Sequence, residues 1–161
     1  MNAQPEEPQE DIKYAKTEVV LKIRSHFVDS VLVGRYEEYH DNGELHKLAF
    51  YNSQGELDEE YFEFDRFGRC VLRYLYDRGK LEGMCERYGD NGKIKECGMY
   101  INNVLHGVNC YRQFYPNGRL KAISSYSHGV LHGESIYYTQ KGTQTARHVY
   151  NHGVCPELSF K

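Results

Sequence analysis

The sequence has no tryptophan, only four prolines and three methionines, and no long apolar run. A membrane-spanning helix needs about 18 consecutive apolar residues, and no segment approaches that length. The first residues, MNAQPEEPQED, form neither a basic leader nor an apolar core, so we expect no secretory signal. These absences predict a soluble, intracellular protein.

A surplus of basic residues is also missing. The chain has 20 lysines and arginines against 23 acidic residues, and four of the acidic residues lie within the first eleven positions. The rest of the chain is therefore nearly neutral. Proteins that bind nucleic acids or acidic lipids through phosphate contacts usually carry a basic surplus. We expect no nucleic-acid partner, and contact with a membrane is disfavoured.

Cysteines are few, odd in number and widely spaced. They are Cys70, Cys85, Cys97, Cys110 and Cys155, and no two form a C-x-x-C pair. This spacing argues against a disulfide scaffold or a zinc ribbon, so we interpret the cysteines as small fillers of the core or surface. The sequence also lacks a nucleophile elbow, a phosphate-binding glycine loop and a recurring carboxylate pair. We predict no enzyme activity, no cofactor, no metal site and no small-molecule site.

Tyrosine and glycine are abundant instead, with 15 residues each. Aromatic residues favour strands, and many glycines with few prolines indicate tight turns. Five turn sequences, HDNG, DRFG, GDNG, YPNG and TQKG, end in glycines separated by 25, 24, 26 and 24 residues. These glycines are Gly43, Gly68, Gly92, Gly118 and Gly142. The spacing predicts a tandem repeat.

Other residues keep a fixed distance from these glycines. Four positions before each glycine lies an aromatic residue: Tyr39, Phe64, Tyr88, Phe114 and Tyr138. Eight positions after each lies a tyrosine: Tyr51, Tyr76, Tyr100, Tyr126 and Tyr150. A leucine-x-glycine step opens most units: Leu32 with Gly34, Leu81 with Gly83, Leu105 with Gly107, and Leu131 with Gly133. The second unit has Leu57 but carries Glu59 in place of the glycine.

Two insertions interrupt the spacing. One extra residue lies between Tyr51 and Leu57, and two lie between Gly107 and Gly118. We expect such residues in turns or bulges, where they do not disturb strand pairing.

The repeat predicts an all-β fold, an elongated single-layer antiparallel sheet of about five tandem hairpins. HDNG and YPNG favour a type I turn followed by a glycine with positive φ. We expect equivalent aromatic rings of neighbouring units to stack into ladders, because a lone hairpin is marginally stable. An acidic, flexible tail is expected over 1–16, and a capping strand or partial repeat over 17–33. Repeats are expected over 34–154 and a C-terminal tail over 155–161. Within the cap, Thr17 to Phe27 is predicted as an unpaired strand.

The histidines suggest a metal site only weakly. His46, His106 and His132 lie near turn junctions, and His128 precedes His132 by four residues. In a helix this spacing would place both rings on one face, but the segment is predicted as a turn. No acidic residue or cysteine recurs beside them, so we interpret them as solvated turn residues.

The segments GRYEEYHDNG and YSHGVLHG resemble the MORN repeat, in particular the variant of bacterial antitoxin-like proteins and large DNA viruses. The resemblance spans roughly Thr17 to Val154. Its departures are Glu59 and Asn103 for glycines and Cys85 and Ser135 for aromatic residues. It implies a twisted sheet of hairpins that makes protein contacts, serves as a scaffold or, in some members, associates with lipids. Tyrosine-rich arrays of this kind also look like those of marseillevirus-type viruses.

We therefore expect a structural adaptor that docks on other proteins, plausibly as a capsid-associated component of a virion. The alternatives are an antitoxin-like regulator that binds one toxin protein and a scaffold on a membrane surface. The sequence does not identify the face or edge that binds the partner.

Overall fold

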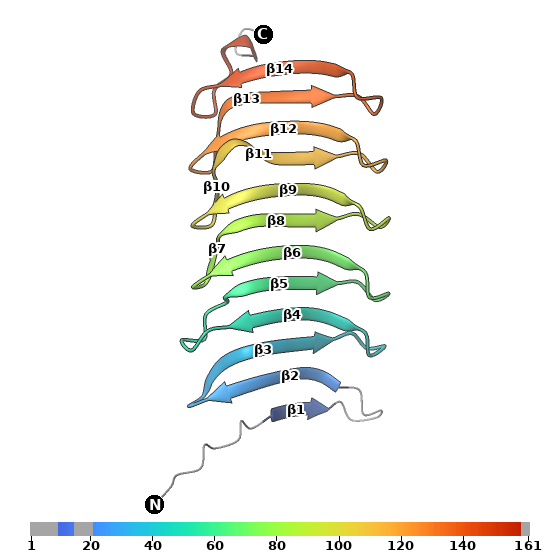
Figure 1. The fold of residues 1–161 in the computed structure, drawn as a ribbon, viewed down its shortest axis with the longest axis vertical. Coiled ribbons are helices and arrows are strands. Elements are labelled where there is room, and N and C mark those ends of the chain that lie inside the picture. Colours follow the sequence, from blue (N-terminus) through green and yellow to red (C-terminus); the bar gives the residue numbers. More distant parts are fainter. Residues whose placement is uncertain (1–9, 15–20, 159–161) are drawn as a thin grey trace, which may run out of the picture.

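The computed structural model describes residues 10–14 and 21–158, which form one open antiparallel sheet. Twelve of its fourteen strands follow one another along the sheet in sequence order, and the two-residue strands β7 and β10 pair with β6 and β9. The sheet is therefore elongated, with β1 and β14 at opposite ends (Figure 1). The strands are β1 (Glu10–Tyr14), β2 (Leu21–Val28), β3 (Val31–Tyr39), β4 (Leu45–Tyr51), β5 (Glu59–Phe64), β6 (Cys70–Asp77), β7 (Lys80–Leu81), β8 (Gly83–Tyr88), β9 (Ile94–Ile101), β10 (Val104–Leu105), β11 (Gly107–Phe114), β12 (Leu120–Ser127), β13 (Val130–Tyr138) and β14 (Gln144–Tyr150). A short 3-10 helix, η1 (Pro156–Leu158), follows. The predicted fold class is confirmed.

The N-terminal end differs from the prediction. The strand expected to be unpaired is β2, and the structure pairs it with β1 from Glu10↔His26 to Tyr14↔Leu21. A sixth hairpin therefore precedes the five predicted from the glycine repeat, and it includes residues 10–14 of the expected acidic tail. The rest of that tail, the start of the predicted strand and the last three residues of the chain lie outside the described residues. Strand β1 was missed because no turn glycine marks its hairpin: Tyr14 ends β1 as Tyr39 ends β3, but the sequence has no glycine before Gly34.

The turns within the hairpins have the predicted form. Gly43 donates its N–H to the carbonyl of His40 at 3.0 Å and has a φ of 86°. Gly118 does the same to Tyr115 at 2.8 Å with a φ of 87°. A type I turn closed by a glycine in the left-handed region explains both, because glycine alone enters that region without a steric penalty.

An asparagine in each of three of these turns reaches the next turn along the array. The Nδ2 groups of Asn42, Asn91 and Asn117 donate to the carbonyls of Arg66, Pro116 and Gln140, at 2.7, 2.7 and 3.2 Å. In the second turn Phe67 replaces the asparagine, and Arg69 instead donates from Nη1 to the carbonyl of Asp90 at 2.7 Å. The N-G sequence therefore closes its own turn and also holds the following one.

The turns between hairpins form a second linked row, at the opposite ends of the strands. Arg78 and Gly79 both have positive φ, 46° and 75°, as a two-residue type I′ turn requires. The N–H of Gly79 donates to the carbonyl of Leu57 at 2.7 Å, and the same link recurs one unit later from Asn103 to Leu81 at 3.0 Å. It continues from Gly129 to Leu105 and from Gly153 to Leu131, at 2.9 and 2.8 Å. The backbone carbonyl of each of these leucines therefore holds the next turn between hairpins.

The two insertions lie where the sequence predicted. The extra residue after Tyr51 enlarges the turn from Asn52 to Glu56, in which the side chain of Asn52 accepts hydrogen bonds from two backbone N–H groups. The two extra residues in β11 form a bulge between Gly107 and Tyr111, where the register changes by two positions against β12. Both insertions are absorbed without a change of strand order.

The aromatic rows lie on opposite faces of the sheet. One face, the tyrosine face, carries Tyr51, Tyr76, Tyr100, Tyr126 and Tyr150, the residues eight positions after each turn glycine. The other, the ion-pair face, carries the row that begins with Tyr39, whose hydroxyl bonds Glu37 on that face at 2.8 Å.

The predicted ladder of equivalent rings is wrong. In the described part of the chain no ring contact joins the row tyrosines of consecutive units. The tyrosine rings instead contact one another within a hairpin, as Tyr36 and Tyr51 do diagonally at 6.1 Å and Tyr61 and Tyr74 do directly across the strands at 6.5 Å. Equivalent residues lie two strands apart, roughly 9.6 Å, which exceeds the range of ring contacts. The intervening strand supplies a leucine: Leu81 faces Tyr76 and Leu105 faces Tyr100.

Cross-strand ion pairs and apolar residues cover the ion-pair face. The guanidinium of Arg73 bridges Glu60 and Glu86 on the two neighbouring strands, at 2.6 and 3.3 Å. Glu37, whose side chain is 5% exposed, pairs with Arg24 and Arg35. The pairs Arg73–Glu86 and Arg24–Glu37 join strands of different hairpins, so they stabilise the array across units as the turn links do.

Candidate interaction surfaces

The tyrosine face is open to solvent because no second layer covers the sheet (Figure 1). Every tyrosine whose burial the structure describes is half-buried, and the buried apolar side chains are small ones such as Ala49, Cys85 and Ala122. A layered domain would instead bury its largest apolar residues. The aromatic mass of this protein therefore contributes to its surface as well as to its stability.

Four row tyrosines keep unpaired hydroxyls. Among the described residues, the hydroxyls of Tyr51, Tyr76, Tyr100 and Tyr126 have no hydrogen-bond partner, and none is a buried unsatisfied atom. They lie one unit apart, roughly 9.6 Å for a step of two strands. The row thus offers regularly spaced aromatic rings with donors and acceptors available to a partner.

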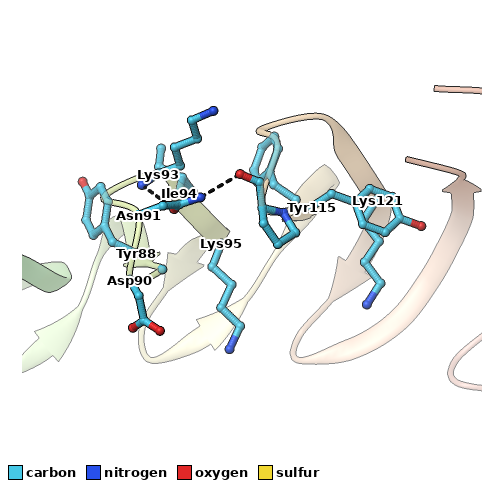
Figure 2. A pocket seen from close by; sticks show the side chains of 11 residues that line it. Tyr88, Asp90, Asn91, Lys93, Ile94, Lys95, Tyr115 and Lys121 are labelled. Carbon is cyan, nitrogen blue, oxygen red and sulfur yellow. Dashed lines mark hydrogen bonds between the residues drawn. The ribbon is translucent and has the colours of Figure 1, made fainter. Parts of the chain in front are cut away.

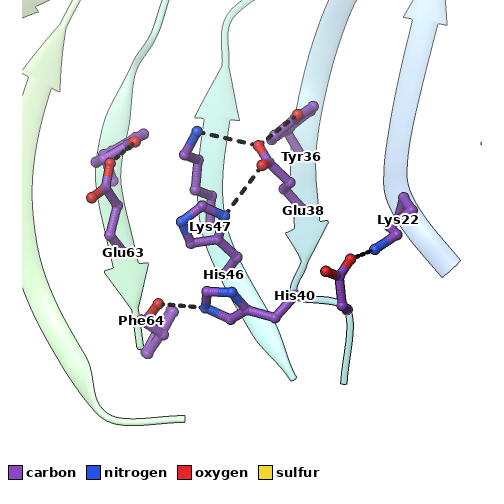
Figure 3. Close-up of polar contacts among 10 residues, drawn as sticks. Lys22, Tyr36, Glu38, His40, His46, Lys47, Glu63 and Phe64 are labelled. Carbon is purple, nitrogen blue, oxygen red and sulfur yellow. Dashed lines mark hydrogen bonds and ion pairs between the residues drawn. The ribbon is translucent and has the colours of Figure 1, made fainter. Parts of the chain in front are cut away.

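At the N-terminal end of this face, charged groups surround Glu38 (Figure 3). Its carboxylate accepts from Lys47 at 3.2 Å and from the hydroxyl of Tyr36 at 3.3 Å, and it lies 3.2 Å from Nδ1 of His46. Partial burial alone would raise the pKa of Glu38, but the hydrogen bonds and charges of Lys47 and His46 lower it. Each group has its partner inside this cluster, so we interpret the cluster as a stabilising network.

Other tyrosines of both faces also bond carboxylates. Burial, followed by the hydrogen bond to Glu96 at 2.6 Å, raises the pKa of Tyr111 to about 12. On the ion-pair face, burial and the bond to Glu86 raise the pKa of Tyr88 to about 12. These phenols remain protonated at neutral pH and act as hydrogen-bond donors.

A hollow of about 550 Å³ lies on the ion-pair face between the turns of the third and fourth hairpins (Figure 2). The rings of Tyr88, Phe114 and Tyr115 line it, together with Lys95 and Lys121. Tyr88 and Phe114 hold equivalent repeat positions, as do Lys95 and Lys121, but sequence analysis missed the hollow because it lies between two units.

The charge of the hollow is positive. Lys93 donates to the carbonyl of Asn117 at 3.3 Å, whereas Lys95 and Lys121 form no ion pair within the described residues and extend from the sheet in the same direction (Figure 2). Asp90 is the acidic residue of the lining. Lys95 and Lys121 can bind an anionic group at this hollow.

The turn histidines form pairs that the sequence did not indicate. The ring of His106 lies 4.9 Å from that of His128, and its Nδ1 accepts the N–H of His128 at 3.2 Å. The rings of His132 and His152 lie 4.6 Å apart, and Nδ1 of His132 accepts the N–H of His152 at 3.4 Å. These histidines hold neighbouring turns together. His46 lies in the network around Glu38.

The cysteines mostly fill the interior, as predicted. Cys85, Cys97, Cys110 and Cys155 are buried, and Cys70 is half-buried. Burial raises the pKa of the Cys85 thiol, which argues against a reactive nucleophile there. Cys155 differs in its surroundings, because its sulfur lies near His148 and Glu157, with the three ligand atoms within 4.8 Å of one another.

Three segments of the chain match a family of known proteins. Residues 32–53, 81–102 and 108–128 match the family described as MORN repeat variant. These segments coincide with the first, third and fourth hairpins of the glycine repeat. No curated protein matches the chain. The described residues contain no helix with the length and hydropathy of a membrane span.

Proposed function

The chain is a MORN-repeat protein, and from this premise we propose that it is a non-enzymatic scaffold that binds another protein on its tyrosine face. MORN repeats serve in general as interaction modules, and a single sheet with two open faces suits that use. The proposal goes further by naming the face.

The row of unpaired tyrosine hydroxyls carries this proposal. Tyrosine is enriched at protein interfaces because its ring buries a large area while its hydroxyl forms a directed hydrogen bond. Here Tyr51, Tyr76, Tyr100 and Tyr126 present both parts at regular spacing. A partner segment in the polyproline II conformation has three residues per turn and a rise of roughly 3.1 Å per residue, so every third residue would meet a tyrosine of the row.

The test separates binding from folding. Phenylalanine at all four positions keeps the rings and removes only hydroxyls that have no partner within the described protein, so the variant should fold as the parent does. We expect cross-linking and mass spectrometry in the native source to find a protein neighbour at fixed stoichiometry on this face, and the variant to bind it at least about tenfold more weakly.

The matched control changes tyrosines of the ion-pair face, Tyr39→Phe and Tyr88→Phe, and should leave the affinity unchanged. Recovery of the chain only as a free monomer, or cross-links confined to the ion-pair face, would contradict the proposal.

The resemblance supplies two finer proposals for the partner. One is a shell protein, which would make the chain a capsid-associated component and would co-purify with it from particles. The other is a toxin protein, which the chain would bind and silence. Loss of the complex in the phenylalanine variant would support binding on the tyrosine face for either partner. The identity of the cross-linked protein distinguishes a shell protein from a toxin.

The hollow on the opposite face favours a second candidate function, attachment to an anionic lipid surface. Lys95 and Lys121 lack partners within the described residues, and an anionic headgroup could bind between them. Flotation with vesicles containing phosphatidylserine tests this function. Binding that Lys95→Glu with Lys121→Glu abolishes would support it, and absence of flotation would exclude it.

A further inference from the structure

The C-terminal segment folds back on the last hairpin and brings three different ligand types together. His148 lies in β14, Cys155 follows the turn after β14, and Glu157 lies in η1. Their ligand atoms lie within 4.8 Å of one another, and Nδ1 of His148 lies 3.6 Å from Oε2 of Glu157. Bond lengths of about 2.0 to 2.3 Å in a tetrahedral site place zinc ligands roughly 3.3 to 3.8 Å apart.

A second observation concerns unsatisfied atoms. Among the described residues, the buried side-chain nitrogen and oxygen atoms without a hydrogen bond are Ser135 Oγ and His148 Nδ1. Both lie in this region, because Ser135 pairs directly with His148 across β13 and β14. Nδ1 of His148 has Glu157 as a charged neighbour, but at 3.6 Å the contact is too long for a hydrogen bond, and a buried nitrogen without a hydrogen bond is unfavourable unless another group binds it. A metal ion would satisfy it.

We propose that His148, Cys155 and Glu157 bind one zinc ion. A thiolate and a carboxylate together balance the two charges of the ion, and the neutral imidazole completes three ligands. One nitrogen, one sulfur and one oxygen suit zinc, whereas magnesium and calcium prefer oxygen alone. Water occupies the fourth position, since the side chain of Glu157 is 67% exposed.

The ion would fasten the C-terminal segment over the tyrosine face at the last hairpin. Cys155 is 5% exposed, and the ring of His148 lies beside Tyr137 at 5.8 Å and Tyr150 at 6.5 Å. A site here terminates the sheet and covers part of β13 and β14. This site departs from the expectation that the chain binds no metal. Sequence analysis missed it, because the three ligands come from one unit and the segment after it and have no equivalents in the other units.

Cobalt is the probe for the test, because a cobalt–thiolate bond absorbs light whereas zinc is silent. We expect the reduced full-length chain to bind one equivalent of cobalt, to show the thiolate charge-transfer band, and to lose the band when zinc is added. Cys155→Ser should abolish the band. The matched control Cys110→Ser, which changes another buried cysteine, should retain it.

If Cys155→Ser does not fold, Glu157→Gln provides a second test, because a change of this exposed side chain should not affect folding. It should weaken cobalt binding by about tenfold or more. A parent chain without the band, or a band that persists in Cys155→Ser, would overturn the proposal. Zinc should also slow amide exchange in residues 144–158 without affecting the first hairpin.

Discussion

Glu59 occupies a backbone position that glycine holds in the other units of the repeat. Its φ is 65°, whereas Gly34, Gly83 and Gly133 have φ values of 70°, 102° and 94°. A residue with a Cβ atom is strained in this region by roughly 1 to 2 kcal/mol. Glu59→Gly should therefore raise the free energy of unfolding by about 1 kcal/mol, measured by urea denaturation.

The reverse substitution provides the control. At Gly34 an added Cβ atom would have no other atom within 4 Å, so Gly34→Ala adds backbone strain without a clash. It should lower the free energy of unfolding by about 1 kcal/mol. A Glu59→Gly variant less stable than the parent would show that the side chain of Glu59 makes a stabilising contact.

Position 98 requires glycine because of packing and not because of backbone conformation. Its φ is ordinary, but a Cβ atom there would lie 2.7 Å from Cδ2 of Leu105 and 3.3 Å from the ring of Tyr111. Gly98→Val should lower the free energy of unfolding by about 1 to 3 kcal/mol, because it overpacks the centre of the tyrosine face. Thermal denaturation measures this, and partial recovery in the double variant with Leu105→Ala would confirm the clash.

At the scale of the element, each hairpin depends on the turn of its neighbour. Asn91 accepts the N–H of Lys93 at 3.1 Å and donates to the carbonyl of Pro116 at 2.7 Å. Asn91→Asp keeps the first bond and replaces the donor of the second with an acceptor. We expect a loss of about 1 kcal/mol in the free energy of unfolding.

Asn109→Asp is the matched control for this turn. Asn109 is exposed in the bulge of β11, and within the described residues its side chain has no hydrogen-bond partner. The same change of charge there should alter the stability by less than about 0.5 kcal/mol. Equal losses in the two variants would show that charge, not the link between turns, determines the effect.

The hairpins themselves were predictable because their signals are local. Gly43 and Gly118 enforce a turn type, and the two extra residues before Gly118 were assigned correctly to a turn or bulge. The pairing of β1 with β2 was not predictable, because no turn glycine lies between them, although β1 ends in an aromatic residue, Tyr14. The separation of Tyr39 and Tyr51 onto opposite faces was missed for another reason: the bulge at each turn shifts the alternation by one residue.

At the scale of the whole molecule, tyrosine burial makes stability depend on alkaline pH. Burial and neighbouring carboxylates raise the pKa of Tyr88 and Tyr111 to about 12, compared with about 10 in an unfolded chain. Loss of the phenolic proton therefore favours the unfolded state. Their contribution is complete below about pH 10 and falls as the pH rises toward 12.

Urea denaturation followed by circular dichroism between about pH 8 and pH 12 measures this dependence. We expect the urea midpoint to be constant up to about pH 10 and then to fall. Tyrosinate absorbance should rise together with the loss of structure. A midpoint that stays constant to about pH 12 would contradict the raised pKa values.

An array held by nearest neighbours should open from its ends. The terminal hairpin of β13 and β14 has one neighbouring hairpin, whereas the hairpin of β8 and β9 has two. Hydrogen exchange should therefore be faster in residues 130–150 than in residues 83–101 when zinc is absent. Uniform protection along the chain would indicate that the sheet unfolds as one cooperative unit.

The candidate surfaces were less predictable than the fold. The repeat did place the row of Tyr51, Tyr76, Tyr100 and Tyr126, but their unpaired hydroxyls depend on which side chains the neighbouring strands supply. The hollow beside Lys95 and Lys121 and the cluster at Cys155 arise where different elements meet. Lys95 and Lys121 hold equivalent positions of the repeat, whereas the residues around Cys155 have no counterpart in other units, and in both cases the three-dimensional arrangement is needed to show the site.

The links between turns have a consequence for length. Because the N–H of Gly79 bonds Leu57 and the N–H of Gly129 bonds Leu105 in the same way, each module fits any copy of its neighbour. Duplicating the 24-residue period would extend the rod by roughly 9.6 Å per copy and leave its cross-section unchanged. The number of hairpins therefore determines the distance between partners bound at the two ends of the sheet.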